Sequence, residues 1–113
     1  MKKWIIFVVL TISMVVYAEK LHTDGKFHEK EIIGEYKGMI EIKAVKGQLI
    51  LYHNWNTPKP LAKLVKAKNG VFRVEYFDKK TPSGLIAWDI KYKTIVDIDD
   101  KLNIINDNYE KFK

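Results

Sequence analysis

The sequence contains no cysteine, which excludes disulfide bonds, thiol nucleophiles and a lipid-modified cysteine. Arg73 is the only arginine, and Ser83 is the only serine after residue 18. The chain lacks a glycine-rich phosphate loop, and Ser83 lacks the glycine spacing of a nucleophile elbow. These absences argue against an enzyme and predict a non-catalytic protein without a cofactor.

Residues 1–18 have the pattern of a secretory signal peptide. Lys2 and Lys3 precede an apolar run over residues 4–17, which is shorter than the roughly 20 residues that a membrane-spanning helix needs. Ala18 then supplies the small residue that a signal peptidase accepts. We therefore expect removal of residues 1–18; the alternative is an uncleaved amphiphilic anchor.

Export without cysteine is typical of a bacterial periplasmic or secreted protein rather than of a disulfide-stapled module. The chain carries a net charge of +6, and therefore +4 without Lys2 and Lys3. Charges of both signs are mixed, and a single arginine without a recognition motif argues against nucleic acid. We expect the partner to be an envelope polymer, a lipid surface or another protein, with no transmembrane helix left after processing.

The remaining chain divides into two parts. Residues 19–31 are polar without a clear period and predict a flexible lead-in, whereas residues 32–113 predict a single β-rich domain. Ile40, Ile42 and Ala44 alternate with charged residues, as in a half-buried strand. A second apolar stretch follows and ends at a proline-containing break.

The dipeptide Asn69-Gly70 predicts a β-hairpin with a type I′ turn, whose two central residues need positive φ. A helix over residues 61–68, with Pro60 in its first turn, is the alternative. The hairpin puts apolar pairs on one face and mostly charged residues on the other. Its predicted pairs are Ala67 with Phe72, Val65 with Val74, Lys63 with Tyr76, Lys68 with Val71, Lys66 with Arg73 and Leu64 with Glu75.

Residues 85–93 alternate clearly between apolar and other side chains, and so predict a strand. If this strand pairs with residues 71–78, bringing the apolar faces together places Trp88 opposite Val74. The same register places Asp89 opposite Arg73 as a cross-strand ion pair. The residues predicted to share the apolar face are Ile86, Trp88, Ile90 and Tyr92.

The C-terminal part allows two interpretations. Residues 94–106 can form a hairpin that turns at residues 99–101, but Leu102, Ile105, Tyr109 and Phe112 also follow a helical spacing. We expect a strand through Ile105, followed by a frayed or short helical end. The six to eight short strands of the chain predict an all-β fold, a small antiparallel barrel or sandwich.

The best candidate for recognition is a stretch where aromatic and amide side chains run from a strand into a proline loop. Such groups stack on and hydrogen-bond a sugar or a peptide. Alternatively, the tryptophan caps the core and the asparagines shape the turn. The candidate binding residues are Tyr52, His53, Asn54, Trp55 and Asn56, together with the basic residues Lys66, Lys68, Lys91 and Lys93.

Metal binding is the second hypothesis. His22, Asp24 and His28 are weak candidate ligands for zinc or copper, although their spacing matches no closed structural site. Together with His53, His22 and His28 would be the residues used by a metal-dependent hydrolase. This enzyme is the rival hypothesis to a binding protein. Asp97 and Asp99 share a strand face, and we interpret them as solubility charges that flank a turn.

Two stretches resemble known families. The sequence NGVFRVEYFDKKTPSGLIAWD resembles bacterial membrane-occupation-type repeats, in which an aromatic strand, a glycine turn and another aromatic strand recur. The order of LILYHNW, LAKL and PSG is similar to that of exported bacterial lysozyme inhibitors of the small-barrel type, whose inhibitory loop carries a Ser-Gly. These resemblances imply a repeat-type interaction protein or an inhibitor, and thus a binding function.

The signal-peptide prediction is tested by the intact mass of the exported protein. We expect a chain that begins at Glu19, because the peptidase cleaves after the small residue Ala18. Recovery of the chain with Met1 at its start would show that the apolar segment stays attached as an anchor.

Overall fold

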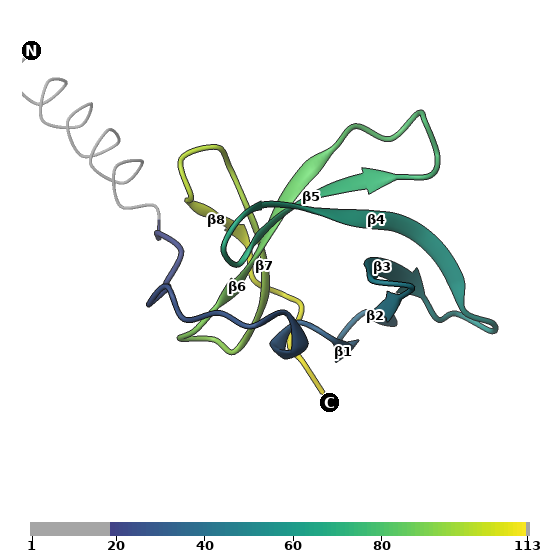
Figure 1. The fold of residues 1–113 in the computed structure, drawn as a ribbon, viewed down its shortest axis with the longest axis horizontal. Coiled ribbons are helices and arrows are strands. Elements are labelled where there is room, and N and C mark those ends of the chain that lie inside the picture. The colour runs from purple at the N-terminus through teal and green to yellow at the C-terminus, as the bar shows by residue number, and fades with distance from the viewer. Residues whose placement is uncertain (1–18, 113) are drawn as a thin grey trace, which may run out of the picture.

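The computed structural model describes residues 19–112, which form one curled antiparallel sheet (Figure 1). Its eight strands follow one another in sheet order, so that each pairs with its neighbours in the chain. The predicted signal peptide, residues 1–18, lies outside the described part. The strands are β1 Gly34–Tyr36, β2 Ile40–Val45, β3 Gln48–His53, β4 Lys59–Lys68, β5 Val71–Tyr76, β6 Gly84–Asp89, β7 Thr94–Ile98 and β8 Ile104–Asn106.

The predicted all-β class is confirmed, and the architecture is a curled half-barrel rather than a two-sheet sandwich. Within residues 19–112 the helical content is a 3₁₀ turn, η1, at Glu29–Glu31. No helix in this range is long and apolar enough to cross a membrane.

The expected short C-terminal helix is wrong. The backbone N–H of Phe112 donates to the carbonyl of Glu35 (2.8 Å), and that of Lys37 donates to the carbonyl of Glu110 (2.7 Å). The end of the chain is therefore extended and pairs with β1, the strand at the other edge of the sheet. This pairing satisfies backbone groups that an edge strand would otherwise leave open.

The concave side of the sheet holds the main core. Buried side chains from all strands except β8 meet there, with Phe27 and Tyr109 packed against them. Tyr36 is buried in this core, and its hydroxyl donates to the carbonyl of Ile32 (2.5 Å), so its polar atom is satisfied. The buried members are Ile32, Tyr36, Ile42, Leu49, Leu51, Ala62, Leu64, Phe72, Val74, Ile86, Trp88 and Ile95.

A second, smaller core lies on the convex side of β5, β6 and β7. Val71, Ala87 and Val96 are directly paired across the three strands and are buried together with Ile98. Leu21, Leu85, Leu102 and Ile104 pack against them. These strands therefore bury side chains on both faces. This is why residues 86–89 of β6 are all buried, although apolar and other side chains alternate there.

The hairpin of β4 and β5 is confirmed against the helical alternative, as is its predicted pair Lys68–Val71, but the turn type and the register beyond that pair are wrong. Only Gly70 of the two turn residues has a positive φ (80°), so the turn is not type I′. A bulge at Ala67 separates the pairs Lys68–Val71 and Lys66–Phe72. Beyond it the register is shifted by one residue and Leu64 faces Val74, because one extra residue turns every following side chain to the other face.

The predicted pairing of β5 with β6 is also wrong. Val74 lies opposite Gly84, not Trp88, and Arg73 lies opposite Leu85. Arg73 instead contacts the carboxylate of Glu75 on its own strand, at 2.7 Å from its Nη2 atom. Asp89, expected on the polar face, is completely buried. Ile90 and Tyr92, expected on the apolar face of the strand, lie in the turn after β6 and are exposed.

The hairpin of β7 and β8 is as predicted. Its connection includes Asp99, whose carboxylate accepts the backbone N–H groups of Lys101 and Asn103 (both 2.9 Å). Leu102 has a positive φ of 66°, which completes the reversal of the chain. Asp99 is thus a turn-forming residue, whereas Asp97 lies within β7.

Residues 19–31, predicted to be a flexible lead-in, lie against the sheet. The backbone of residues 19–21 pairs with that of residues 102–104, and the backbone N–H of Ile90 donates to the carbonyl of His22 (3.0 Å). Phe27 then packs edge-on against Phe72 and touches Gly70. Leu21 thus covers the convex core and Phe27 covers the main core, and the hydrogen bond to Ile90 fixes where His22 lies.

The two phenylalanines near β5 form a matched test of the core. Phe72 is 1% exposed, and Phe72→Ala should lower the free energy of unfolding by about 3–5 kcal/mol, because it leaves a cavity in the main core. Phe77 is 51% exposed, so Phe77→Ala should change it by less than about 0.5 kcal/mol. Urea unfolding measures both; equal losses would contradict the burial of Phe72.

Candidate functional site

The candidate site lies where the β3–β4 loop meets the β1–β2 turn. The backbone N–H of Asn54 donates to the carbonyl of Met39 (2.8 Å), which ties the two loops together. Gly38 and Met39 both have positive φ, so the chain reverses tightly and presents the Met39 side chain outward. The C-terminal Phe112 joins them because its backbone pairs with that of Glu35.

These segments surround a surface hollow of about 300 Å³. Its wall combines backbone-rich loops with apolar side chains, of which Met39 is 48% exposed and Phe112 is 62% exposed. Trp55, the residue after Asn54, is 61% exposed. The residues that line the hollow are Glu35, Tyr36, Gly38, Met39, Ile40, Asn54 and Phe112.

Asn54 is the polar residue that the fold places most firmly in this hollow. Its Nδ2 donates to Oε1 of Glu41 (2.7 Å). Its Oδ1 is buried and accepts no hydrogen bond from residues 19–112. A buried acceptor without a partner costs free energy, about 1–3 kcal/mol.

The other predicted residues of this stretch do not converge on the hollow. Tyr52 pairs with Glu41 on β2, and the ammonium of Lys43 lies 5.3 Å from its ring centroid, a cation–π contact. His53 points to the opposite face of β3, because successive residues in a strand alternate. Asn56 is exposed in the β3–β4 loop.

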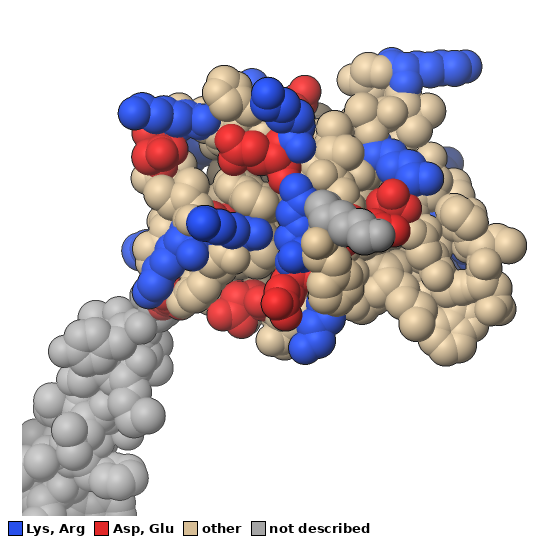
Figure 2. Space-filling view, turned by 90° about the horizontal axis from the view of Figure 1, so that it is seen from below, with Lys and Arg blue, Asp and Glu red and all other residues tan. Residues whose placement is uncertain are grey.

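The predicted basic residues lie far from Trp55. Lys66 and Lys68 are near the β4–β5 turn and Lys91 and Lys93 in the β6–β7 turn, whereas the β3–β4 loop is at the opposite end of the molecule (Figure 1). In the face seen in Figure 2, lysine and arginine side chains are interspersed with acidic ones rather than gathered in one patch. The structure therefore separates the two groups that the sequence suggested as one surface.

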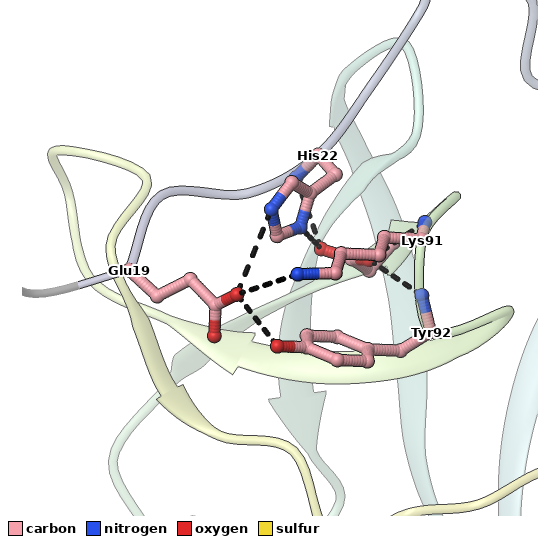
Figure 3. Close-up of polar contacts among 5 residues, drawn as sticks. Glu19, His22, Lys91 and Tyr92 are labelled. Carbon is pink, nitrogen blue, oxygen red and sulfur yellow. Dashed lines mark hydrogen bonds and ion pairs between the residues drawn. The ribbon is translucent and has the colours of Figure 1, made fainter.

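His22 is held in a polar cluster beside the β6–β7 turn (Figure 3). Its Nδ1 lies 2.8 Å from Oδ2 of Asp89, and its backbone N–H donates to the same oxygen (2.9 Å). The other oxygen of Asp89 accepts the backbone N–H groups of Lys91 and Tyr92 (both 2.9 Å). Asp89 is therefore a fully hydrogen-bonded buried carboxylate that fixes both the N-terminal segment and the β6–β7 turn.

Glu19 completes the cluster on its exposed side. Its Oε2 accepts the hydroxyl of Tyr92 (2.5 Å) and lies 3.6 Å from Nε2 of His22 and 3.8 Å from Nζ of Lys91. The hydrogen bond to Glu19 raises the pKa of Tyr92 to about 12, so that Tyr92 remains a donor at neutral pH. The pairing of a carboxylate with a histidine resembles a general-base arrangement, but Ser83 lies in the β5–β6 connection and not at this cluster.

The weak metal candidates are not gathered into one site. Oδ1 of Asp24 accepts the backbone N–H of Lys26 (2.9 Å), a local turn, and His28 is the exposed residue before η1. His22 has Asp89 as its partner instead. Residues 19–112 contain no group of three or more His, Asp or Glu side chains placed to hold a metal ion.

Of the residues that line the hollow, sequence reasoning found only Asn54, and Met39 and Phe112 are the exposed apolar members that it missed. Met39 follows Gly38, and this pair between two strands was the available signal for a tight turn with an outward side chain. Phe112 follows a helical spacing in the sequence. Its position beside β1 results from pairing between residues more than 70 positions apart, which no local sequence pattern can predict.

Comparison with protein-family models, with curated proteins and with solved structures finds no match to this chain.

The buried Asp89 gives the fold a pH dependence. Burial alone raises the pKa of Asp89, but the hydrogen bonds from the backbone of His22 and Tyr92, together with the imidazole of His22, outweigh burial and hold this pKa below its usual value. The ionised carboxylate therefore stabilises the fold above the unfolded-state pKa of about 3.9, and this contribution is lost as the pH falls through the lower folded-state value.

Asp89→Asn should accordingly lower the free energy of unfolding by about 1–3 kcal/mol at neutral pH, because it faces an amide N–H₂ toward buried donors, and by less in acid. Asp24→Asn keeps the acceptor of an exposed turn and is the matched control, with little effect at either pH. Urea unfolding at both pH values measures this. A loss that is the same at both would contradict the role of the ionised carboxylate.

Proposed function

We propose that this chain is an exported, non-catalytic binding protein of the bacterial envelope, and that it engages a protein partner at the hollow beside Asn54. The observation that carries the proposal is the meeting of two exposed apolar side chains, Met39 and Phe112, in a hollow that Asn54 also lines, with the exposed Trp55 next to Asn54 in the chain. Methionine and aromatic residues are enriched in protein interfaces, where they anchor binding.

The chemistry of the hollow favours a protein over the other expected partners. An anionic envelope polymer or a lipid head group calls for a positive surface, and the candidate lysines lie at the other end of the molecule. The hollow instead offers the apolar side chains of Met39 and Phe112 and the carboxylate-bearing Glu35, which would repel an anion. A protein partner that inserts an apolar side chain between Met39 and Phe112 fits this lining.

One further point supports a non-catalytic protein. The buried carboxylate of Asp89, which His22 contacts, acts as a structural clamp, because four donor groups from His22, Lys91 and Tyr92 occupy its two oxygens.

Site-specific photo-crosslinking in the native envelope tests the position of the interface. A benzophenone amino acid at position 55 should give a crosslinked partner, whereas the same group at Ile105, 67% exposed on β8, should not. Equal crosslinking from both positions would contradict an interface at the hollow.

With the captured partner purified, Phe112→Ala and Trp55→Ala should each weaken binding by roughly 30-fold, the loss expected for an anchor residue worth about 2 kcal/mol. The melting temperature should stay close to that of the native protein, because both side chains are exposed. Unchanged binding by both variants would place the interface elsewhere.

A further inference from the structure

The concave side of the half-barrel encloses a cavity separate from the hollow. Its volume is about 130 Å³, and its walls come from six strands, β2 to β7, and from the C-terminal segment. An engineered apolar cavity of about 150 Å³ is large enough to bind benzene. The space therefore suits one molecule of about the size of a single ring.

Most of the wall is aliphatic, with one charged exception. The aliphatic side chains come from Ile40, Leu51, Leu61, Val74, Ile86 and Ile95. Asp97 is the charged residue among those that line the cavity. It lies on the concave face because it is paired with Ile86, which in turn is paired with the buried Phe72. A carboxylate thus occupies a position that the apolar side chains Ile86 and Phe72 fill in β6 and β5.

Asp97 is only partly satisfied by the protein. Its Oδ2 accepts the hydroxyl of Tyr109 (2.9 Å) and lies 3.4 Å from Nδ2 of Asn106. Among residues 19–112 no lysine, arginine or histidine forms an ion pair with it. A half-buried negative charge on an apolar wall favours a positively charged group beside it.

Tyr76 and Tyr109 add aromatic surface to the same cavity. Burial, followed by the hydrogen bond to Asp97, raises the pKa of Tyr109 well above its usual value, so its hydroxyl stays a donor that holds Oδ2 in place. Tyrosine rings also attract cations over their faces. A carboxylate and two tyrosines among aliphatic side chains are the groups that recognise an organic ammonium ion.

We propose that this cavity binds a small primary amine with an apolar body of about one ring, and that Asp97 pairs with its ammonium group. This site is independent of the protein-binding hollow, with which it shares Ile40 alone. Absence of crosslinking at position 55 would therefore leave the proposed amine site standing. Absence of amine binding would likewise leave the proposed protein interface standing.

Benzylamine is the probe, with toluene and benzyl alcohol as uncharged probes of the same body. In a titration followed by NMR of the cavity methyl groups, benzylamine should bind the native protein at least about tenfold more tightly than either neutral probe, as an added charge-assisted hydrogen bond implies. Equal binding of the three, or no binding of benzylamine, would overturn the proposal without any variant.

Three variants locate the interaction. Asp97→Asn keeps an acceptor for Tyr109 and should weaken benzylamine by about tenfold or more while leaving toluene unchanged. Asp100→Asn removes the same charge from an exposed residue outside the cavity and should have no effect. Leu61→Phe fills the cavity and should abolish binding of all three probes. Full benzylamine affinity in Asp97→Asn, or in Leu61→Phe, would overturn the assignment.

Discussion

The backbone pairing between the C-terminal segment and β1 joins the two ends of the curled sheet, and both proposed sites depend on it. Phe112 reaches the hollow because its backbone N–H donates to Glu35. Tyr109 reaches the inner cavity because the same segment crosses the concave side, where Oγ1 of Thr94 donates to its carbonyl (2.5 Å). Without this pairing, β1 would expose an open edge and the main core would lose Tyr109 as a cover.

The other end of the molecule is organised by a buried charge. Asp89 accepts hydrogen bonds from both the N-terminal segment and the β6–β7 turn, so one carboxylate orders two stretches of chain that are far apart in sequence. The N-terminal segment in turn covers the convex core of β5, β6 and β7. Asp89 and Asp97 thus have different roles. Both carboxylate oxygens of Asp89 accept hydrogen bonds from the protein, whereas Asp97 can still accept a hydrogen bond from a bound group.

Local patterns in the sequence were reliable where a strand has one wet face. The alternation around Ile42 and the hairpin turn at Gly70 led to correct elements, because side-chain period and turn preferences act within a few residues. The same patterns did not predict the register in which the strands pair. The bulge at Ala67 and the pairing of Arg73 with Leu85 depend on how neighbouring strands fit together, and a shift of one residue exchanges the two faces.

The sequence by itself determined the all-β class, the succession of hairpins and the exclusion of thiol and phosphate-loop chemistry, since these follow from residue types and short-range periodicity. Only the tertiary structure decided that Asp89 is buried, that Asp97 lines a cavity and that Phe112 lies beside Asn54. It also separated the candidate lysines from Trp55. The physical reason is that each of these positions results from pairing between distant segments, and the curvature of the sheet decides which residues then share a surface.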